Sequence, residues 1–296
     1  MSKAIFFMRH RASTLPLRFV WGLSISILGL TLVLQSITPG FWALFVQFKP
    51  SVAQALQASL LAGGATGIGA LGVLTLRRGT DIQGMFGFLA LSAGVMFSAA
   101  LLSLIVPAVS MTSVPAALDV LLAGVLGYAA MAALDRFLPH MHSAPRESGA
   151  WPADSVRLMV VAIAVHNLPE GFAVGAGFGG GDALGWGTAV SIGMQNIPEG
   201  LIVATALWSI GASRDKAFWL SVATGLLEPL GAVLGLFAVT ASTMVLPWAL
   251  AVAGGAMFFV ILEELIPESL KGASRPAMAA YFVAGSLSMA ALLTAF

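Results

Sequence analysis

The chain has 296 residues, of which 58% are hydrophobic and only 9% are Asp, Glu, Lys or Arg. A typical soluble domain has about 25% charged residues, so this composition excludes a soluble globular protein and indicates an integral membrane protein. The absence of cysteine excludes disulfides, thiolate nucleophiles and thiolate metal ligands. The net charge of +1 gives no electrostatic basis for binding nucleic acid.

The chain begins with a basic segment, which is followed by an apolar run over residues 19–37. A secretory signal peptide would have a shorter apolar run, and an A-x-A cleavage site would follow it. We therefore expect a retained transmembrane helix over 19–45.

Further apolar segments follow in chain order, each close to the roughly 20 residues that cross a bilayer as a helix. They lie at 52–76, 84–107, 115–138, 156–178, 184–209, 216–240, 245–267 and 276–295. The connections are short, and the longest, at 139–155, is predicted to be a cytoplasmic loop. The predicted fold class is an all-α, polytopic transmembrane helix bundle with a single membrane domain over 1–296.

The basic residues set the orientation of these spans. With a cytoplasmic N-terminus, all 14 Lys and Arg residues except Lys49 fall on the cytoplasmic side. A wrong number of spans would rarely give such a distribution. It therefore supports nine spans and predicts a C-terminus on the outside.

Several polar residues lie near the centres of the predicted spans, where an ionised side chain costs roughly 2.5–3.5 kcal/mol. They are His166, Asn167 and Glu170 in the fifth span, Gln195, Asn196 and Glu199 in the sixth, and Glu228 in the seventh. Met96 lies at the centre of the third span. Residues at the centres of antiparallel spans share one depth, so the pattern predicts one site at the midplane of the bilayer.

Two of these polar segments are near copies, H-N-L-P-E-G at 166–171 and Q-N-I-P-E-G at 195–200. Residues three and four apart lie on one side of a helix, so Glu170 lies angularly between His166 and Asn167. A carboxylate in this position can bridge two ions held side by side, and the second segment repeats the arrangement.

The proline inside each segment removes one helical hydrogen bond and frees the carbonyl four residues earlier. Such carbonyls are tolerated where they line a polar cavity. The alternative interpretation is a polar cluster that only holds helices together. Three glutamates, an imidazole and two prolines at one depth exceed what packing requires, so we favour an ion site.

The types of ligand narrow the choice of ion. Ca²⁺ and Mg²⁺ prefer oxygen ligands, so the imidazole of His166 argues against them. The absence of thiolates argues against a dedicated Cu(I) site. Imidazole combined with carboxylate suits Zn²⁺, Fe²⁺, Mn²⁺, Co²⁺ or Cd²⁺.

These motifs resemble those of the ZIP (Zrt/Irt-like protein) family of metal transporters, and most closely its bacterial GufA-like branch. The paired segments at 166–171 and 195–200 resemble the family's fourth and fifth helices. G-V-M at 94–96 resembles its second helix, G-L-L-E-P-L-G at 225–231 its sixth, and E-E-L-I-P-E at 263–268 the end of its seventh. The resemblance covers nearly the whole chain.

The resemblance implies an eight-helix core over 52–296, with the helix at 19–45 as an extra N-terminal span. It implies import of Zn²⁺, with Cd²⁺, Fe²⁺, Mn²⁺ or Co²⁺ also accepted, into the cytoplasm across a bacterial inner membrane. Transport in the family is by alternating access, with one helix bundle moving against another, often as a homodimer. No cofactor and no enzymatic activity are implied, because the metal is the transported substrate.

The family's binuclear site can be carried over to this sequence. The first ion would use Met96, His166, Glu170, Gln195 and Glu199, and the second Asn167, Asn196, Glu228 and the shared glutamates. Gln195 stands where many members have His, and Asn196 stands where some close members have Asp. Neutral ligands at these positions are expected to weaken the second ion site.

Polar residues also lie nearer the ends of the spans. Ser110 and Asp119 are expected at the outer mouth, where they would guide an ion inward, although a capped helix start explains Asp119 equally well. The inner end holds Asp135, His140, His142, Glu263 and Glu264, where we expect a release path or a regulatory metal site. A solvated loop is the alternative for the two histidines.

Three other functions are alternatives to metal transport. An intramembrane metalloprotease needs H-E-x-x-H, and His166 is the single histidine within a predicted span. A proton or other ion carrier could use Glu170, Glu199 and Glu228 as a relay, and it would bind no Zn²⁺. A membrane metal sensor would bind the ion without transporting it, and the sequence does not separate this function from transport.

Overall fold

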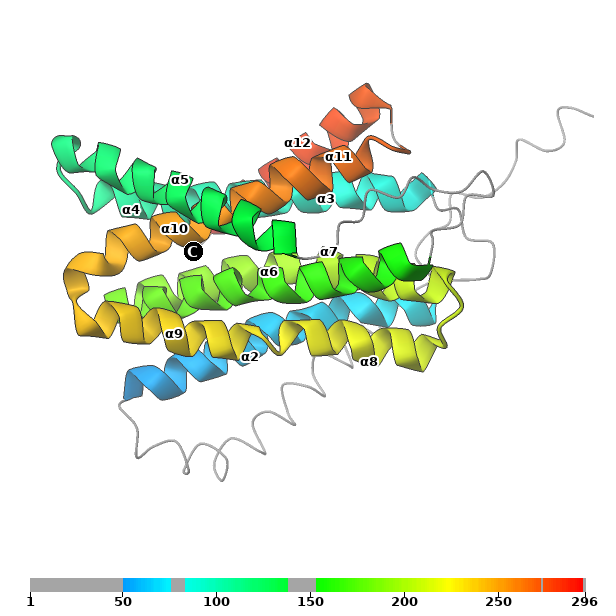
Figure 1. The fold of residues 1–296 in the computed structure, drawn as a ribbon, viewed down its shortest axis with the longest axis horizontal. Helices are drawn as coiled ribbons and strands as arrows, with labels where there is room; N and C mark the ends of the chain where they lie inside the picture. Colours follow the sequence, from blue (N-terminus) through cyan, green and yellow to red (C-terminus); the bar gives the residue numbers. More distant parts are fainter. Residues whose placement is uncertain (1–49, 76–82, 138–152, 273, 295–296) are drawn as a thin grey trace, which may run out of the picture. The chain divides into compact units, whose positions relative to one another are not determined.

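The structure is a computed structural model that describes residues 50–75, 83–137, 153–272 and 274–294. These residues are almost entirely helical and include no strand, so the all-α fold class is confirmed for them (Figure 1). The helix expected over 19–45, most of the 139–155 loop, His140 and His142 lie outside the described residues.

The elements follow one another with short connections. In chain order they are α2 (Pro50–Ala70), the 3-10 turn η1 (Leu71–Leu74), α3 (Gln83–Ala99), the π-helical turn η2 (Ala100–Ile105), α4 (Val106–Ser110), α5 (Val114–Phe137), α6 (Ala153–Gly180), α7 (Asp182–Ser209), α8 (Arg214–Gly225), α9 (Glu228–Ala241), the 3-10 turn η3 (Thr243–Val245), α10 (Leu246–Phe259), the π-helical turn η4 (Val260–Leu265), α11 (Ile266–Ser269) and α12 (Arg275–Leu293).

Seven helical segments among the described residues are long and apolar enough to cross a membrane. They are Ser51–Leu74, Phe86–Ser110, Ala116–Arg136, Val160–Gly180, Arg214–Ala241, Thr243–Ser269 and Arg275–Leu293. α7 is not among them, although it has 28 residues, because it carries several polar side chains. With α7, these segments correspond to the predicted spans that follow residue 50, which confirms a polytopic bundle.

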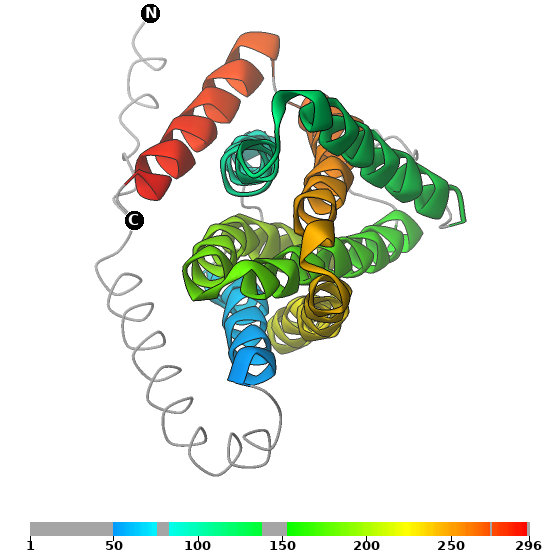
Figure 2. The ribbon, with the colours of Figure 1, turned by 90° about the vertical axis from the view of Figure 1, so that its left-hand side faces the viewer.

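The helices pack into two groups. In the first helix group, α2, α6, α7, α8 and α9, the most extensive pairings are α6 with α9 and α2 with α7. The second helix group consists of α3, η2, α4, α5, α10, η4, α11 and α12, and its most extensive pairings are α3 with α12 and α5 with α10. The second group occupies the upper part of Figure 2 and the first group the lower part. Smaller contacts of α6 with α10 and of α3 with α7 join the groups.

Glycines bring the helices of each group into backbone contact. In the first group, a Cβ atom on Gly171 would overlap the carbonyl oxygen of Glu228, and one on Gly200 would overlap that of Thr66. In the second group, a Cβ atom on Gly255 would overlap the carbonyl oxygen of Gly124. Such close approach is typical of membrane helices that pack through small residues.

The bundle has two ends, which we name after elements that lie there (Figure 1). The α4 end holds α4, the turn at Gly181 between α6 and α7, and the start of α10. The α11 end holds α11 and the connection between α7 and α8. At the α4 end Gly181 has a φ of 125°, which glycine tolerates and other residues rarely adopt. A single residue therefore suffices to reverse the chain between two long helices.

The span predicted as a continuous helix over 216–240 is broken. α8 ends at Gly225, a turn follows at Leu226 and Leu227, and α9 begins at Glu228. Pro229 has no N–H to donate to the carbonyl of Gly225, and glycine is a weak helix former. Together they end α8 in the middle of the span and place Glu228 in the first turn of a new helix.

The spans predicted over 84–107 and 245–267 each contain a π-helical turn, η2 and η4. Each turn ends two residues before a proline, Pro107 or Pro267. These prolines cannot donate to the carbonyls of Ser103 and Glu263, four residues earlier, so the regular α-helical pattern cannot continue there. Turns of this kind occur frequently at functional sites.

Candidate metal centre

The first helix group buries the polar residues that the sequence placed at mid-span. They are His166, Asn167 and Glu170 on α6, Gln195, Asn196 and Glu199 on α7, and Glu228 at the start of α9, and none is more than 5% exposed. Met96, from α3 in the second group, is fully buried. Burying so many polar groups is unfavourable unless they find partners, so their contacts indicate what the cluster can do.

Glu170 and Gln195 connect α6 to α7. The Nε2 atom of Gln195 donates a hydrogen bond of 2.7 Å to Oε1 of Glu170. Glu170 also lies within electrostatic range of Glu199 and Glu228. Three carboxylates from three helices therefore gather where a cation would relieve their repulsion.

Asn196 and Glu228 form a second connection. The Nδ2 atom of Asn196 donates to Oε1 of Glu228 at 2.5 Å and to the carbonyl oxygen of Ala62 at 3.0 Å. This one amide thus joins α7 to α9 and α2. Glu228 lies in the first turn of α9, where the positive end of the helix dipole favours a carboxylate. The break in the span therefore helps to accommodate this buried acid.

Several buried atoms of this cluster have no hydrogen-bond partner among the residues that the structure describes. They are Oε2 of Glu170, Oε1 of Gln195, Oδ1 of Asn196, Oε2 of Glu228 and both side-chain heteroatoms of Asn167. Leaving such a group unpaired costs about 1–3 kcal/mol, and more when the group is charged. All but one of these atoms are oxygens, which are electron-pair donors, so a bound cation would satisfy them together.

Glu264 joins the cluster from the second helix group. Its Oε1 atom lies 3.1 Å from Nε2 of His166. Glu264 was predicted to lie at the inner end of the bundle, away from the centre, whereas the structure places it in contact with a predicted ligand, His166. Spacing along a regular helix could not show this, because Glu264 lies within the π-helical turn η4.

Within residues 50–75, 83–137, 153–272 and 274–294, no three His, Asp or Glu side chains are already arranged to hold one ion. Glu170 and Glu228 are paired with amides, and His166 is paired with Glu264. The candidate ligands are therefore gathered in one place, but five of them, His166, Glu170, Gln195, Asn196 and Glu228, are already paired with other side chains. An incoming ion would have to exchange with some of these bonds.

The ZIP zinc transporter family model matches residues 153–293, a stretch that includes the cluster residues of α6, α7 and α9 together with Glu264. The zinc transporter GufA of Myxococcus xanthus is 42% identical over 229 residues, which are 73% of this chain and 89% of the relative. The chain belongs to the ZIP family.

Other bacterial ZIP relatives align over most of their length. The zinc transporter ZIPB of Bordetella bronchiseptica is 35% identical over 247 residues, covering 78% of this chain and 77% of the relative. The zinc transporter ZupT of Akkermansia muciniphila is 32% identical over 256 residues, which are 79% of this chain and 94% of the relative. The relatives are named as transporters, which agrees with the expectation that this ZIP chain is not an enzyme.

One polar residue near the centre of this ZIP chain was missed in the sequence analysis. Ser92 is fully buried on α3, and its hydroxyl has no hydrogen-bond partner in the part of the chain that the structure describes. It lies four residues before Met96 and so on the same face of the helix. That spacing was the signal that could have identified it.

The residues expected at the outer mouth are exposed at the α4 end. Ser110 ends α4 and donates a hydrogen bond of 2.9 Å to the carbonyl oxygen of Pro107. Asp119 lies more than one turn inside α5, which begins at Val114. The capped helix start that was considered for Asp119 is therefore wrong, because a capping residue precedes the first turn.

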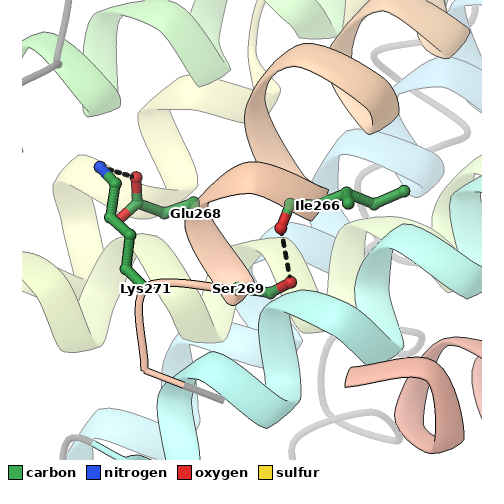
Figure 3. Close-up of polar contacts among 4 residues, drawn as sticks. All are labelled: Ile266, Glu268, Ser269 and Lys271. Carbon is green, nitrogen blue, oxygen red and sulfur yellow. Dashed lines mark hydrogen bonds and ion pairs between the residues drawn. The ribbon is translucent and has the colours of Figure 1, made fainter. Parts of the chain in front are cut away.

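Glu263 and Asp135, the other described residues that were predicted at the inner end of the bundle, lie in the second helix group. Tyr128 on α5 donates to Oε1 of Glu263 at 2.5 Å, which joins α5 to η4. Asp135 is half-buried near the end of α5. In α11 and just beyond it, Lys271 forms an ion pair of 2.6 Å with Glu268, and Ser269 donates to the carbonyl oxygen of Ile266 at 2.8 Å (Figure 3).

Proposed function

We propose that the protein transports divalent transition-metal ions, chiefly Zn²⁺, across a bilayer through the candidate metal centre. The observation that carries this proposal is the set of buried, unpartnered oxygens beside an imidazole, midway along spanning helices. Imidazole and carboxylate ligands suit Zn²⁺, and also Cd²⁺, Fe²⁺, Mn²⁺ and Co²⁺. The printed names of the relatives support zinc as the principal ion.

We assign two adjacent ion positions to the centre. The first ion binds Met96, His166, Glu170, Gln195 and Glu199, and the second binds Asn167, Asn196, Glu228, Glu170 and Glu199. Gln195 and Asn196 support this assignment, because each donates its NH₂ group to a carboxylate and keeps its oxygen free. Each amide can therefore position a glutamate and bind the ion at the same time.

The pairing of His166 with Glu264 suggests how the ion leaves the centre. Nε2 of His166 contacts either Glu264 or an ion at the first position, but not both. We propose that an ion leaving toward the α11 end releases His166 to Glu264. Asp135, His140, His142 and Glu263 then form the release or regulatory region beyond, and Ser110 and Asp119 line the entrance at the α4 end.

Transport is proposed to be by alternating access, with one helix group moving against the other. The glycine contacts support this, because they tighten each group internally. The distribution of Lys and Arg supports a cytoplasmic N-terminus and a C-terminus outside, which makes the α11 end cytoplasmic. We propose import toward that end, the direction that membership of the ZIP family implies. We place the protein in the inner membrane of a bacterium, as a homodimer.

The test is uptake of Zn²⁺ and Cd²⁺ into proteoliposomes by the wild type, by Glu199→Ala and by a matched control, Asp215→Ala. Asp215 is an exposed acid in the first turn of α8. We expect saturable uptake that Glu199→Ala abolishes and Asp215→Ala preserves.

Other outcomes would favour the other functions. Equal uptake by the wild type and Glu199→Ala would contradict the assignment of the site. Metal binding without uptake would favour a membrane metal sensor. Absence of metal binding would favour a proton or other ion carrier that uses the three glutamates as a relay.

A further inference from the structure

Two serines connect the helix groups on the α4 side of the metal centre. The Oγ atoms of Ser103, in η2 of the second group, and Ser191, on α7 of the first group, lie 2.7 Å apart. Ser191 is fully buried. The hydrogen bond therefore crosses the boundary along which the two groups would have to separate.

The bonding pattern identifies the donor. Ser191 Oγ also lies 2.8 Å from the carbonyl oxygen of Gly187. A serine hydroxyl has one proton to donate, so when Ser191 donates it to Gly187, Ser103 is the donor to Ser191. Removing the Ser103 hydroxyl then breaks the bond between the groups and leaves Ser191 with a partner.

The position of this pair relative to the centre follows from the course of the two helices. Ser191 precedes Gln195 by four residues on one face of α7, in the direction of the Gly181 turn at the α4 end. Ser103 follows Met96 along the segment that leads to α4. The serine pair therefore lies beyond the centre toward the α4 end.

A second contact between the groups joins His166 to Glu264, and it lies on the α11 side of the metal centre. His166 is one turn from Glu170 in the direction of the start of α6, and Glu264 lies near the end of the segment that leads to α11. Polar contacts between the helix groups thus occur on both sides of the centre. The residues from the second group, Ser103 and Glu264, each come from a π-helical turn.

We propose that the hydrogen bond between Ser103 and Ser191 closes the metal centre toward the α4 end and breaks each time an ion passes on that side. This inference rests on the transport function proposed above. A hydrogen bond between neutral groups contributes only about 0.5–1.5 kcal/mol net. The bond therefore stabilises the closed arrangement but is weak enough to break during each transport cycle. Once separated, the two hydroxyl oxygens can replace part of the water shell of a passing ion.

Cysteine cross-linking tests the closure directly, because the chain has no native cysteine. In the variant S103C/S191C the two sulfurs replace atoms 2.7 Å apart. Oxidation is expected to reduce Zn²⁺ uptake into proteoliposomes at least tenfold, and reduction is expected to restore it. The matched control is S98C/S286C, because Ser98 donates to the carbonyl oxygen of Ser286 within the second group. Oxidation should leave uptake by this control unchanged.

A second experiment does not depend on uptake. A single reporter cysteine, Met96→Cys, is labelled with a membrane-impermeant maleimide added to one side of the membrane and then to the other. Adding Ser103→Ala should speed labelling from the α4 side about two- to tenfold, the range that corresponds to losing one such bond. Adding Ser98→Ala, which removes a bond within the second group, should not change the rate.

The results separate the two proposals. Full uptake by oxidised S103C/S191C, with the cross-link confirmed by mass spectrometry, would overturn the closure. Unchanged labelling upon Ser103→Ala would overturn it as well. Absence of Zn²⁺ uptake by the wild type would refute the transport function, and the labelling experiment would still decide whether the serine pair closes the centre.

Discussion

The two helix groups are built alike but bury different chemistry. Both hold their helices together through glycine contacts to backbone carbonyls. The first group buries the imidazole, the amides and three carboxylates of the centre, whereas the second contributes Met96, Glu264 and the hydroxyls of Ser92 and Ser103. The site is therefore assembled mainly within one group, and the other group covers it.

The hydrogen bonds within the centre follow the same division. Gln195 with Glu170 and Asn196 with Glu228 are bonds within the first group that join α6, α7 and α9, and the Asn196 bond to the Ala62 carbonyl adds α2 as a fourth helix. A movement of one group against the other would leave these bonds intact. We therefore expect the ligands of the first group, which are all the assigned ligands except Met96, to move as a unit. The following variants test the difference between the groups.

The largest effect is expected from Glu170→Ala in the first group. Glu170 is assigned to both ion positions, and it is bonded to Gln195. Losing an outer partner of a metal site costs about 10–100-fold in affinity, and loss of a bridging ligand should cost more. Zn²⁺ binding by isothermal titration calorimetry, together with uptake, measures this. Wild-type affinity in the variant would show that the ion binds elsewhere.

Gly171→Val should destabilise the first group. The added side chain would overlap the carbonyl of Glu228 on α9, and overpacking of this kind typically costs about 1–3 kcal/mol. We expect a lower melting temperature in detergent and weaker Zn²⁺ binding, because Glu228 would be displaced. Gly64→Ala is the control, since nothing lies within 4 Å of a Cβ atom at that position. If both variants melt alike, the backbone contact does not matter.

Asn196→Asp should strengthen the second ion position by about tenfold, which corresponds to 1.4 kcal/mol. The added carboxylate would repel Glu228 in the metal-free protein and bind a cation between them. Metal titration should therefore show a tighter second binding event and a larger gain in thermal stability on adding Zn²⁺. An unchanged second event would mean that Asn196 holds Glu228 without contacting an ion.

The smallest effect is expected from Tyr128→Phe in the second group. This change removes the hydrogen bond to Glu263, which contributes about 0.5–1.5 kcal/mol. Because the bond lies within one group and outside the centre, uptake should change by no more than about twofold while the melting temperature falls slightly. A large loss of Zn²⁺ affinity would show that the second group takes part in binding more directly than its chemistry suggests.

Much of the centre could be predicted from spacing along regular helices. The repeated segments at 166–171 and 195–200, together with Glu228, lie on neighbouring helices whose mid-span residues share one depth. Residue spacing did not predict the structure where the helices are irregular. It could not show that Gly225 and Pro229 break a span, or that a π-helical turn brings Glu264 to His166. Nor could it show which carboxylate each amide binds, because that depends on side-chain conformation.

The π-helical turn at Ala100–Ile105 also affects how insertions and deletions act on this helix. A turn of this kind holds one residue more than an α-helical turn, and one residue corresponds to a rotation of about 100°. Deleting a single residue there would leave Met96 in place and rotate everything that follows it in the span. A small evolutionary step at this point could therefore change which side chains face the ion's path without any substitution along it.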